Sequence, residues 1–307
     1  MGLTDFTVRR IRRGLVSWHW HVGAGSRRYV LRRYNPWREG IDYEHSLLEH
    51  LARERWPVAV PLKAPTGKTL VRVDGCSYSL FPFLPGRPRL NSTSELAMAR
   101  GRLLASLHKA ADPLLALGER EGSAPMHEYA SKRSAPNGRT FTDVLPGFVR
   151  AQPQLGRKLQ RHHERLAPVL AQLRDLRQTV IHGDFSNWNV LYKHNEVTGI
   201  LDFDFARPDL AMADVAICTR FENDPAVWTA FVRGYLTGHS LADAQCEAFV
   251  PLRMARGLAH AVPALAFWET GRDDMLEQIQ IAVDELDRDE ADADALRADF
   301  EIAATER

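Results

Sequence analysis

Two short stretches of this chain set acidic, amide and imidazole side chains among apolar neighbours. The first is HGDFSNWN at residues 182–189, and the second is ILDFDFA at residues 200–206. TVI (179–181) before the first stretch and VLY (190–192) after it are typical of short buried strands. Polar groups in a tight loop between buried strands must be satisfied by hydrogen bonds or by a ligand. Residues 182–189 are therefore a candidate functional loop.

Three side chains in and after this loop have the chemistry of a metal-assisted transfer site. We expect Asp184, Asn189 and Asp202 to lie at strand ends on one side of a small sheet. Carboxylate and amide oxygens are hard ligands suited to Mg²⁺. If Asn189 and Asp202 hold the metal, Asp184 remains to orient and deprotonate an attacking group. A single Asp here would be a turn former, but the combined His-x-Asp-x₄-Asn and apolar-Asp-apolar pattern is more specific.

The elements before this loop begin with a strand-rich segment. WHWHV (18–22) and RYVLRRY (28–34) are rich in aromatic and β-branched residues and flank GAGS, which predicts a hairpin. DYEHSLLEHLARERW (42–56) repeats leucines at helical spacing. LVRVDGCSYSLF (70–81) alternates around Asp-Gly, a strong hairpin signal. The first part of the chain is therefore predicted to be a small antiparallel sheet with one helix.

The composition changes after residue 81. FPFLPGRPR (81–89) is dense in Pro and Gly, and it is the best candidate for a domain boundary. STSE (92–95) has the form of a capping box before a helix, and helical patterns return at 156–178 and dominate from 210 onward. SKRSAPNGRT (131–140) is polar and predicts a mobile loop. His162-His163-Glu164 lacks the spacing of a zinc motif and is predicted to be a solvated helix face.

In their order along the chain, these motifs resemble the aminoglycoside phosphotransferase/choline kinase-like superfamily. His182-Gly183-Asp184 through Asn189, followed by Ile200-Leu201-Asp202-Phe203, is similar to its catalytic and metal-binding motifs. The resemblance implies a small-molecule kinase with an α+β, bilobal, protein-kinase-like fold. Its small N-lobe would hold an antiparallel sheet with one helix, and its larger C-lobe would be mainly helical. Residues 1–85 would form the nucleotide-binding lobe, ending in a hinge at 81–86, and residues 86–307 the catalytic and acceptor-binding lobe.

The resemblance also implies roles for single residues, with ATP and Mg²⁺ as cofactors. Asp184 would be the catalytic base, or at least orient the substrate hydroxyl, and His182 would support the loop. Asn189 and Asp202 would bind Mg²⁺, which offsets phosphate charge in a loose transition state. The nucleotide would be bound by the ion pair of Arg32 and Glu44, by the hinge residues Phe81 and Phe83, and by Gly14 and Ser17 of RGLVS.

The chain departs from the superfamily pattern in two places. Arg32 stands where Lys is usual, and its forked guanidinium clamps a phosphate with a different geometry. No GxGxxG is present before it. Asp214, in ADVA, resembles the second Asp that braces the catalytic loop. Asp204 has two open roles, as part of the outer metal shell or as an exposed or helix-capping carboxylate.

The acceptor is open between an antibiotic such as an aminoglycoside and a metabolite. TGILDFDFARPDL followed by ADVAIC (198–218) is similar to bacterial homoserine kinases of the superfamily, and choline is a third possibility. Glu222, Asp224, Glu269 and Asp273 are candidates to meet a cationic acceptor. The rival hypothesis is a non-catalytic kinase-like scaffold, motivated by Arg32 and the poor glycine loop. Retention of the two Asp and the Asn argues against it.

Composition narrows the class of partner. The 307 residues are 45% hydrophobic and 26% charged, with a net charge of +1, so no global charge bias favours nucleic acid or an anionic membrane. We therefore expect a small-molecule acceptor, with neither nucleic acid nor membrane as partner, and a monomer or homodimer. Three distant cysteines and no apolar leader at the N-terminus predict a cytoplasmic protein.

Overall fold

The computed structural model describes residues 6–11, 17–133, 137–222 and 224–305. They form two compact units. The first unit combines Met1–Arg89 with Trp188–Asp202, and the second combines Leu90–Asn187 with Phe203–Arg307. The linear division at residue 85 does not contain this return of the chain to the first unit at 188–202. The assignment of nucleotide and acceptor binding to separate lobes stays a prediction.

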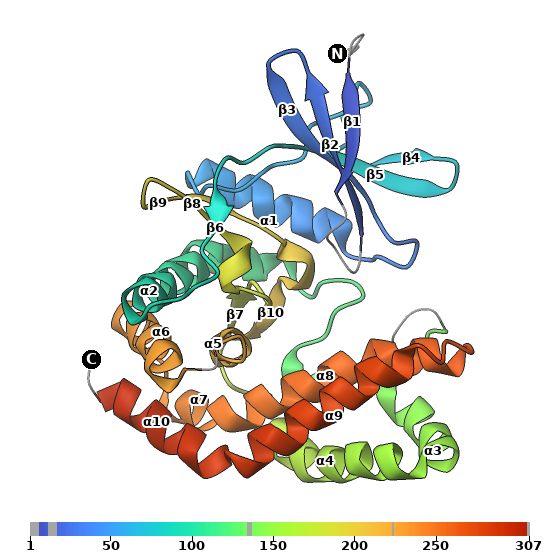
Figure 1. Ribbon diagram of the computed structural model, residues 1–307, viewed down its shortest axis with the longest axis vertical. Coiled ribbons are helices and arrows are strands. Elements are labelled where there is room, and N and C mark those ends of the chain that lie inside the picture. Colours follow the sequence, from blue (N-terminus) through green and yellow to red (C-terminus); the bar gives the residue numbers. More distant parts are fainter. Residues whose placement is uncertain (1–5, 12–16, 134–136, 223, 306–307) are drawn as a thin grey trace. The chain divides into compact units, whose positions relative to one another are not determined.

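The first unit contains the antiparallel sheet that the sequence predicts (Figure 1). Its strand order is β1-β2-β3-β5-β4, and helix α1 follows β3 along the chain. Asp74 and Gly75 join β4 to β5 with positive φ angles of 47° and 75°, as an Asp-Gly hairpin requires. The bounds are β1 Thr7–Ile11, β2 Trp18–Ala24, β3 Arg27–Arg33, α1 Ile41–Arg53, β4 Val71–Val73 and β5 Cys76–Pro82.

The strands that flank the candidate loop do not share a sheet, and the expectation of one small sheet is wrong. β7 (Gln178–Ile181) pairs with β10 (Arg207–Leu210) in the second unit. β8 (Val190–Lys193) pairs with β9 (Glu196–Ile200) and with β6 (Arg87–Pro88) in the first. The physical reason is that the loop carries the chain from one unit to the other, so its flanking strands meet different partners.

The second unit is mainly helical (Figure 1). Helices α2 and α6 pack closely at two glycines. A Cβ on Gly101 would lie 2.1 Å from the carbonyl oxygen of Phe231, and a Cβ on Gly234 would lie 2.1 Å from the carbonyl oxygen of Met98. The N-cap of α2 is Thr93, whose side chain accepts the Leu96 N–H, one residue later than the predicted box places it. Among the described helices, none has the length and apolar character needed to cross a bilayer. The helices are α2 Ser94–Ala111, α3 Phe141–Ala151, α4 Pro153–Ala171, α5 Ala211–Thr219, α6 Pro225–Gly238, α7 Asp243–Glu247, α8 Phe249–Glu269, α9 Met275–Ala291 and α10 Ala293–Thr305.

Candidate active site

The start of the candidate loop is held by one buried carboxylate. Asp214, in α5, accepts the backbone N–H of His182 at 2.7 Å and that of Gly183 at 2.9 Å, through different oxygens. The Asp214 side chain is fully buried. The bracing that the resemblance implied for this residue is therefore present. Because both hydrogen bonds fix backbone groups, they set the path of the chain into Asp184.

His182 and Gly183 restrict this path further. The Asp184 N–H donates to His182 Nδ1 at 3.2 Å, and the His182 ring contacts Phe203 at a centroid distance of 4.5 Å. Gly183 has a φ of +81°, and a Cβ there would lie 2.4 Å from the Phe205 carbonyl oxygen. Only glycine fits both the φ and the space. The predicted supporting role of His182 matches these contacts, while its effect on activity stays a prediction.

A second buried layer supports Asp214. His108 Nε2, on α2, lies 3.0 Å from Asp214 Oδ2, and the Tyr235 hydroxyl, on α6, lies 2.8 Å from His108 Nδ1. Burial alone would raise the pKa of Asp214, but the hydrogen bond from His108 and nearby positive charge hold it below its usual value. Burial raises the pKa of Tyr235, so its hydroxyl stays protonated. Neither His108 nor Tyr235 is among the site residues predicted from the sequence. The available signal was one imidazole inside the apolar helix LLASLHKAA.

The turn after Asp202 is held by Arg120, which the sequence analysis also missed. Its Nη1 donates to the carbonyl oxygens of Phe203 at 3.0 Å and Ala206 at 2.7 Å. Arg120 is buried, and so is Asp204, whose exposed alternative is therefore wrong. Arg120 lies 83 residues before Phe203, so no local pattern could have indicated the contact.

Asn189 and Asp202 lie at one end of the β8–β9 pair in the first unit. Val190 pairs with Ile200, and the Leu201 N–H donates to the Asn189 carbonyl at 2.8 Å. Asp202 has a φ of +63°, a left-handed conformation that is uncommon outside glycine but that Asp adopts more readily than most residues. Their carboxylate and amide oxygens are the ligand types that Mg²⁺ prefers. This donor set fits the proposed metal.

The predicted ion pair of β3 and α1 is formed. Arg32 Nη1 lies 3.0 Å from Glu44 Oε1, and both side chains are buried. Arg38 Nη2 binds the other Glu44 oxygen at 3.1 Å. Ser17 accepts a hydrogen bond from Arg32 Nη2 at 3.3 Å, so its described contact is to this arginine. Gly14 lies outside the described residues.

The two predicted hinge residues make different contacts within the first unit. Phe81 lies on β5, and its ring meets His45 edge-on at 6.0 Å. The Phe83 N–H donates to the Arg28 carbonyl at 3.1 Å, and the Arg28 guanidinium lies 4.2 Å from the Phe83 ring centre. The Phe83 N–H is thus used inside the first unit. An adenine contact at this residue would need its carbonyl or its ring.

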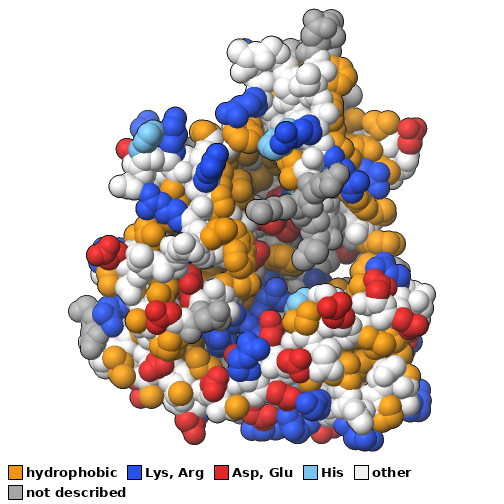
Figure 2. All heavy atoms as spheres, in the orientation of Figure 1, with side chains coloured by type: hydrophobic (Ala, Val, Ile, Leu, Met, Phe, Trp, Pro, Cys, Tyr) orange, Lys and Arg blue, Asp and Glu red, His pale blue; other side chains and the backbone are white. Residues whose placement is uncertain are grey.

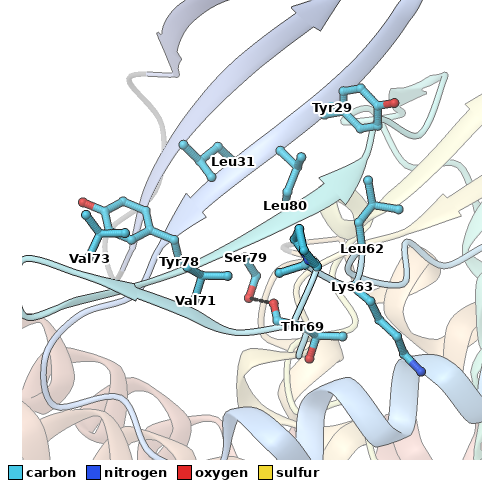
Figure 3. A pocket seen from close by; sticks show the side chains of 12 residues that line it. Tyr29, Leu31, Leu62, Lys63, Thr69, Val71, Val73, Tyr78, Ser79 and Leu80 are labelled. Carbon is cyan, nitrogen blue, oxygen red and sulfur yellow. Dashed lines mark hydrogen bonds between the residues drawn. The ribbon is translucent and has the colours of Figure 1, made fainter. Parts of the chain in front are cut away.

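A groove in the first unit lies apart from the ion pair. It has a volume of about 490 Å³ and a mostly apolar lining (Figure 3). Leu31 and Leu80 are paired across β3 and β5 and both line it, while Arg32 follows Leu31 and points to the other face of the sheet. None of the residues that line the groove is a predicted site residue, so the groove is not assigned to the candidate site.

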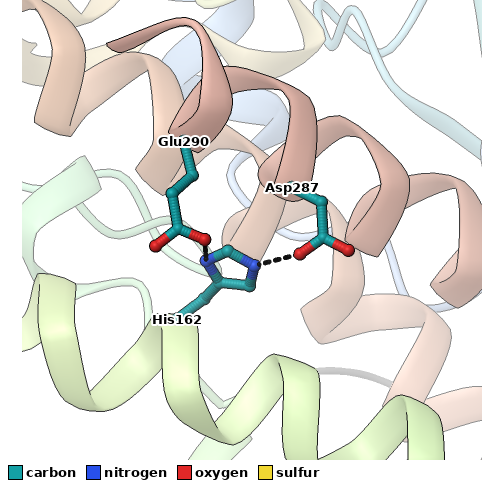
Figure 4. Close-up of side chains that lie close together, drawn as sticks. All are labelled: His162, Asp287 and Glu290. Carbon is teal, nitrogen blue, oxygen red and sulfur yellow. Dashed lines mark hydrogen bonds and ion pairs between the residues drawn. The ribbon is translucent and has the colours of Figure 1, made fainter. Parts of the chain in front are cut away.

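Two further sets of polar residues do not join the site. His162 is buried, so the predicted solvated face is wrong. It lies 2.8 Å from Asp287 Oδ1 and close to Glu290 (Figure 4). This trio has the proximity of a metal site. Arg161 also binds both acids at 3.0 Å, and Lys158 and Arg165 add further positive charge. The acids are therefore already neutralised by cations of α4.

Acids predicted to meet a cationic acceptor are mostly used by the chain itself. Glu222 accepts a hydrogen bond from Arg100 at 2.6 Å, and both side chains are nearly buried. Glu269 pairs with Arg139 and accepts from Asn137 at 2.6 Å. Asp224 caps α6 by accepting the Ala226 N–H. These three carboxylates therefore already have partners within the chain.

The chain is similar to known proteins in sequence and in fold. The sequence model described as "Phosphotransferase enzyme family" matches residues 7–250. A homoserine kinase of Methylobacterium nodulans is 30% identical over 205 residues, which cover 64% of this chain and 58% of that kinase. Seven further curated relatives, 25–31% identical, are also homoserine kinases, and the matches cover 66–84% of their lengths.

Solved structures show the same protein-kinase-like α+β fold at low sequence identity. The crystal structure of a spectinomycin phosphotransferase with ADP and spectinomycin matches with a TM-score of 0.64 and 14% identity, over 92% of this chain and 93% of that one. The structure of a microcompartment-associated aminopropanol kinase matches with a TM-score of 0.62 and 18% identity, over 96% and 94%.

Proposed function

This chain belongs to the phosphotransferase enzyme family, and on that premise we propose that it transfers the γ-phosphoryl group of ATP to a hydroxyl of a small molecule, with Mg²⁺ as cofactor. The observation that carries the proposal is the pair of hydrogen bonds that Asp214 accepts from the backbone N–H groups of His182 and Gly183. A loop fixed at its backbone holds the next side chain, Asp184, in a defined place. Positioning is what phosphoryl transfer chiefly asks of a protein.

Each residue has a defined task in this proposal. Asp184 aligns the acceptor hydroxyl and takes its proton as the new P–O bond forms. Arg32, held by Glu44, binds phosphate oxygens of ATP, because a guanidinium forms charge-assisted hydrogen bonds with phosphate. Asn189 and Asp202 hold Mg²⁺, which supplies positive charge against the phosphates.

We propose a small hydroxyl-bearing metabolite as the acceptor, with homoserine as the first candidate. The names of the curated relatives support it. The state of the acids supports it as well, since Glu222 and Glu269 are bound to arginines of the chain and are poorly placed to attract a polycationic aminoglycoside. We also propose a cytoplasmic monomer or homodimer. Cys76, Cys218 and Cys246 are free thiols, as is usual in a reducing compartment.

The test is to incubate the purified protein with Mg-ATP and separate acceptors: homoserine, choline, 3-aminopropan-1-ol, spectinomycin and an aminoglycoside. ADP release and product mass are followed together. A product heavier by one phosphoryl group supports the proposal and names the acceptor. A folded protein that binds neither nucleotide nor acceptor, and forms no product, would overturn it in favour of the non-catalytic scaffold.

A further inference from the structure

The second unit holds several arginines whose charges are already neutralised. Arg207 binds Asp209 at 2.6 Å, and Arg220 binds Glu285 at 2.8 Å. Arg253 binds Asp289 at 3.0 Å. Each of these guanidinium groups is largely buried beside its own carboxylate. The pairing follows from the high cost of a buried charge without a counter-charge.

Arg256 breaks this rule. It lies one turn after Arg253 on α8, is half-buried, and makes no hydrogen bond or ion pair within the described part of the chain. Burial, together with the positive charges of Arg220 and Arg207, lowers its pKa to about 10. The charges of Asp184 and Glu285 act in the opposite direction. Arg256 is therefore a cation in the neighbourhood of the candidate catalytic carboxylate.

Glu285 and Asp289 of α9 form their ion pairs with other arginines. Arg220 uses both Glu285 and Asp289, and its Nη1 also donates to the Arg253 carbonyl at 2.6 Å. His260, one further turn along α8, has a pKa lowered by burial and by Arg256, so it is neutral near pH 7 and adds no charge. In Figure 2, Lys and Arg side chains gather in the middle of the face shown. Arg256 is a half-buried cation that no carboxylate of the described residues binds directly, so an anionic ligand could pair with it.

We propose that Arg256 binds a carboxylate of the acceptor, so that the substrate is a small hydroxy acid rather than a simple amino alcohol. This inference rests on the proposed function. A planar guanidinium and a carboxylate form two parallel charge-assisted hydrogen bonds. An acceptor held by its carboxylate at Arg256 presents its hydroxyl to Asp184.

The two probes that test the inference differ in one group. Homoserine carries a hydroxyl, an ammonium and a carboxylate, and 3-aminopropan-1-ol has the same hydroxyl and ammonium without the carboxylate. The wild type is expected to use homoserine with the higher kcat/KM. In Arg256→Gln, the KM for homoserine should rise by roughly 10- to 100-fold, as expected for the loss of a hydrogen bond between charged groups. The kcat/KM for 3-aminopropan-1-ol should change by less than about threefold.

Two variants serve as controls. Arg256→Lys keeps the positive charge, so its KM for homoserine should lie between those of the wild type and Arg256→Gln. The Lys ammonium cannot form the two parallel hydrogen bonds of the guanidinium. Arg297→Gln removes an exposed arginine of α10 that pairs with Asp294, and it should leave both substrates unchanged. Thermal unfolding of each variant, followed by circular dichroism, shows whether the protein is folded under the assay conditions.

The outcomes separate this inference from the proposed function. If Arg256→Gln lowers kcat equally for both probes, Arg256 acts on the transferred phosphoryl group, and the carboxylate site is overturned while the kinase stands. A wild type that phosphorylates 3-aminopropan-1-ol or choline as well as homoserine overturns it in the same way. A folded wild type that phosphorylates no acceptor of either kind contradicts the proposed function itself.

Discussion

His108 Nε2 lies 3.0 Å from Asp214 Oδ2, and both side chains are completely buried. Asp214 in turn binds the two backbone N–H groups that lead into Asp184. The geometry of the candidate catalytic loop therefore depends on a helix that begins nearly ninety residues earlier in the chain, at Ser94. We therefore expect stability and the proposed activity to be coupled through Asp214.

Asp214→Asn should reduce both the free energy of unfolding and the rate of phosphoryl transfer. The amide nitrogen cannot accept a hydrogen bond, so one backbone N–H of the loop loses its buried partner. We expect the free energy of unfolding to fall by about 2–4 kcal/mol and the rate of phosphoryl transfer to fall with it. Urea unfolding and kcat measure the two effects. Asp294→Asn, at a fully exposed position of α10, is the control and should stay within about 0.5 kcal/mol of the wild type. A stable, fully active Asp214→Asn variant would contradict the proposal that the hydrogen bonds of Asp214 fix the loop.

Gly183→Ala tests the path of the loop. The new Cβ would meet the Phe205 carbonyl oxygen at 2.4 Å in a backbone with φ of +81°. Gly67→Ala is the matched control, since its φ is +80° but nothing lies within 4 Å of the added carbon. The control should lose about 1 kcal/mol of unfolding free energy from backbone strain alone, and Gly183→Ala should lose more. Equal losses in thermal or urea unfolding would show that the close contact carries no cost.

Arg32 variants test the phosphate clamp. Arg32→Ala should raise the KM for ATP by about tenfold or more, because a charge-assisted contact to phosphate is lost. Arg32→Lys keeps a positive charge beside Glu44 and should retain most of the affinity. Steady-state kinetics at fixed Mg²⁺ and saturating acceptor separates the two. Unchanged KM for ATP in Arg32→Ala would exclude Arg32 from nucleotide binding.

Stability should fall on acidification through the His162 cluster. Burial holds the pKa of His162 below its usual value, despite the hydrogen bond to Asp287. The unfolded chain therefore binds more protons than the folded chain as the pH drops through about 6.5, and the free energy of unfolding decreases below that pH. Urea unfolding at pH 7.5 and 5.5 should show this loss, and His162→Gln should reduce its size. His194→Asn, at an exposed turn, is the control and should leave the pH dependence unaltered.

Local signals in the sequence were sufficient for the small sheet. Asp74-Gly75 and the alternation around it gave the β4–β5 hairpin, because the turn geometry depends on those two residues. The pair of Arg32 and Glu44 was accessible through the resemblance, since β3 and α1 are neighbours along the chain. Interactions within one hairpin or between adjacent elements leave a readable pattern.

Contacts between distant segments could not be predicted from the sequence. Arg120 stabilises the turn at Phe203 and Ala206 through carbonyl oxygens, which any residue type provides. Arg256 is distinguished from Arg253 by the absence of a partner among the described residues, and a sequence shows charges but not pairings. The separation of β7 and β8 into two sheets has the same origin, because each finds its partner in a different unit.

The most direct test of the central claim compares the wild type with Asp184→Asn in the transfer of phosphate from Mg-ATP to homoserine. Product mass and ADP are measured together, and nucleotide binding is followed by calorimetry. We predict one phosphoryl group added per ADP released by the wild type. In Asp184→Asn, we predict a loss of about 10²–10⁴-fold in kcat, with Mg-ATP affinity nearly unchanged. Wild-type turnover in a folded Asp184→Asn would contradict the account.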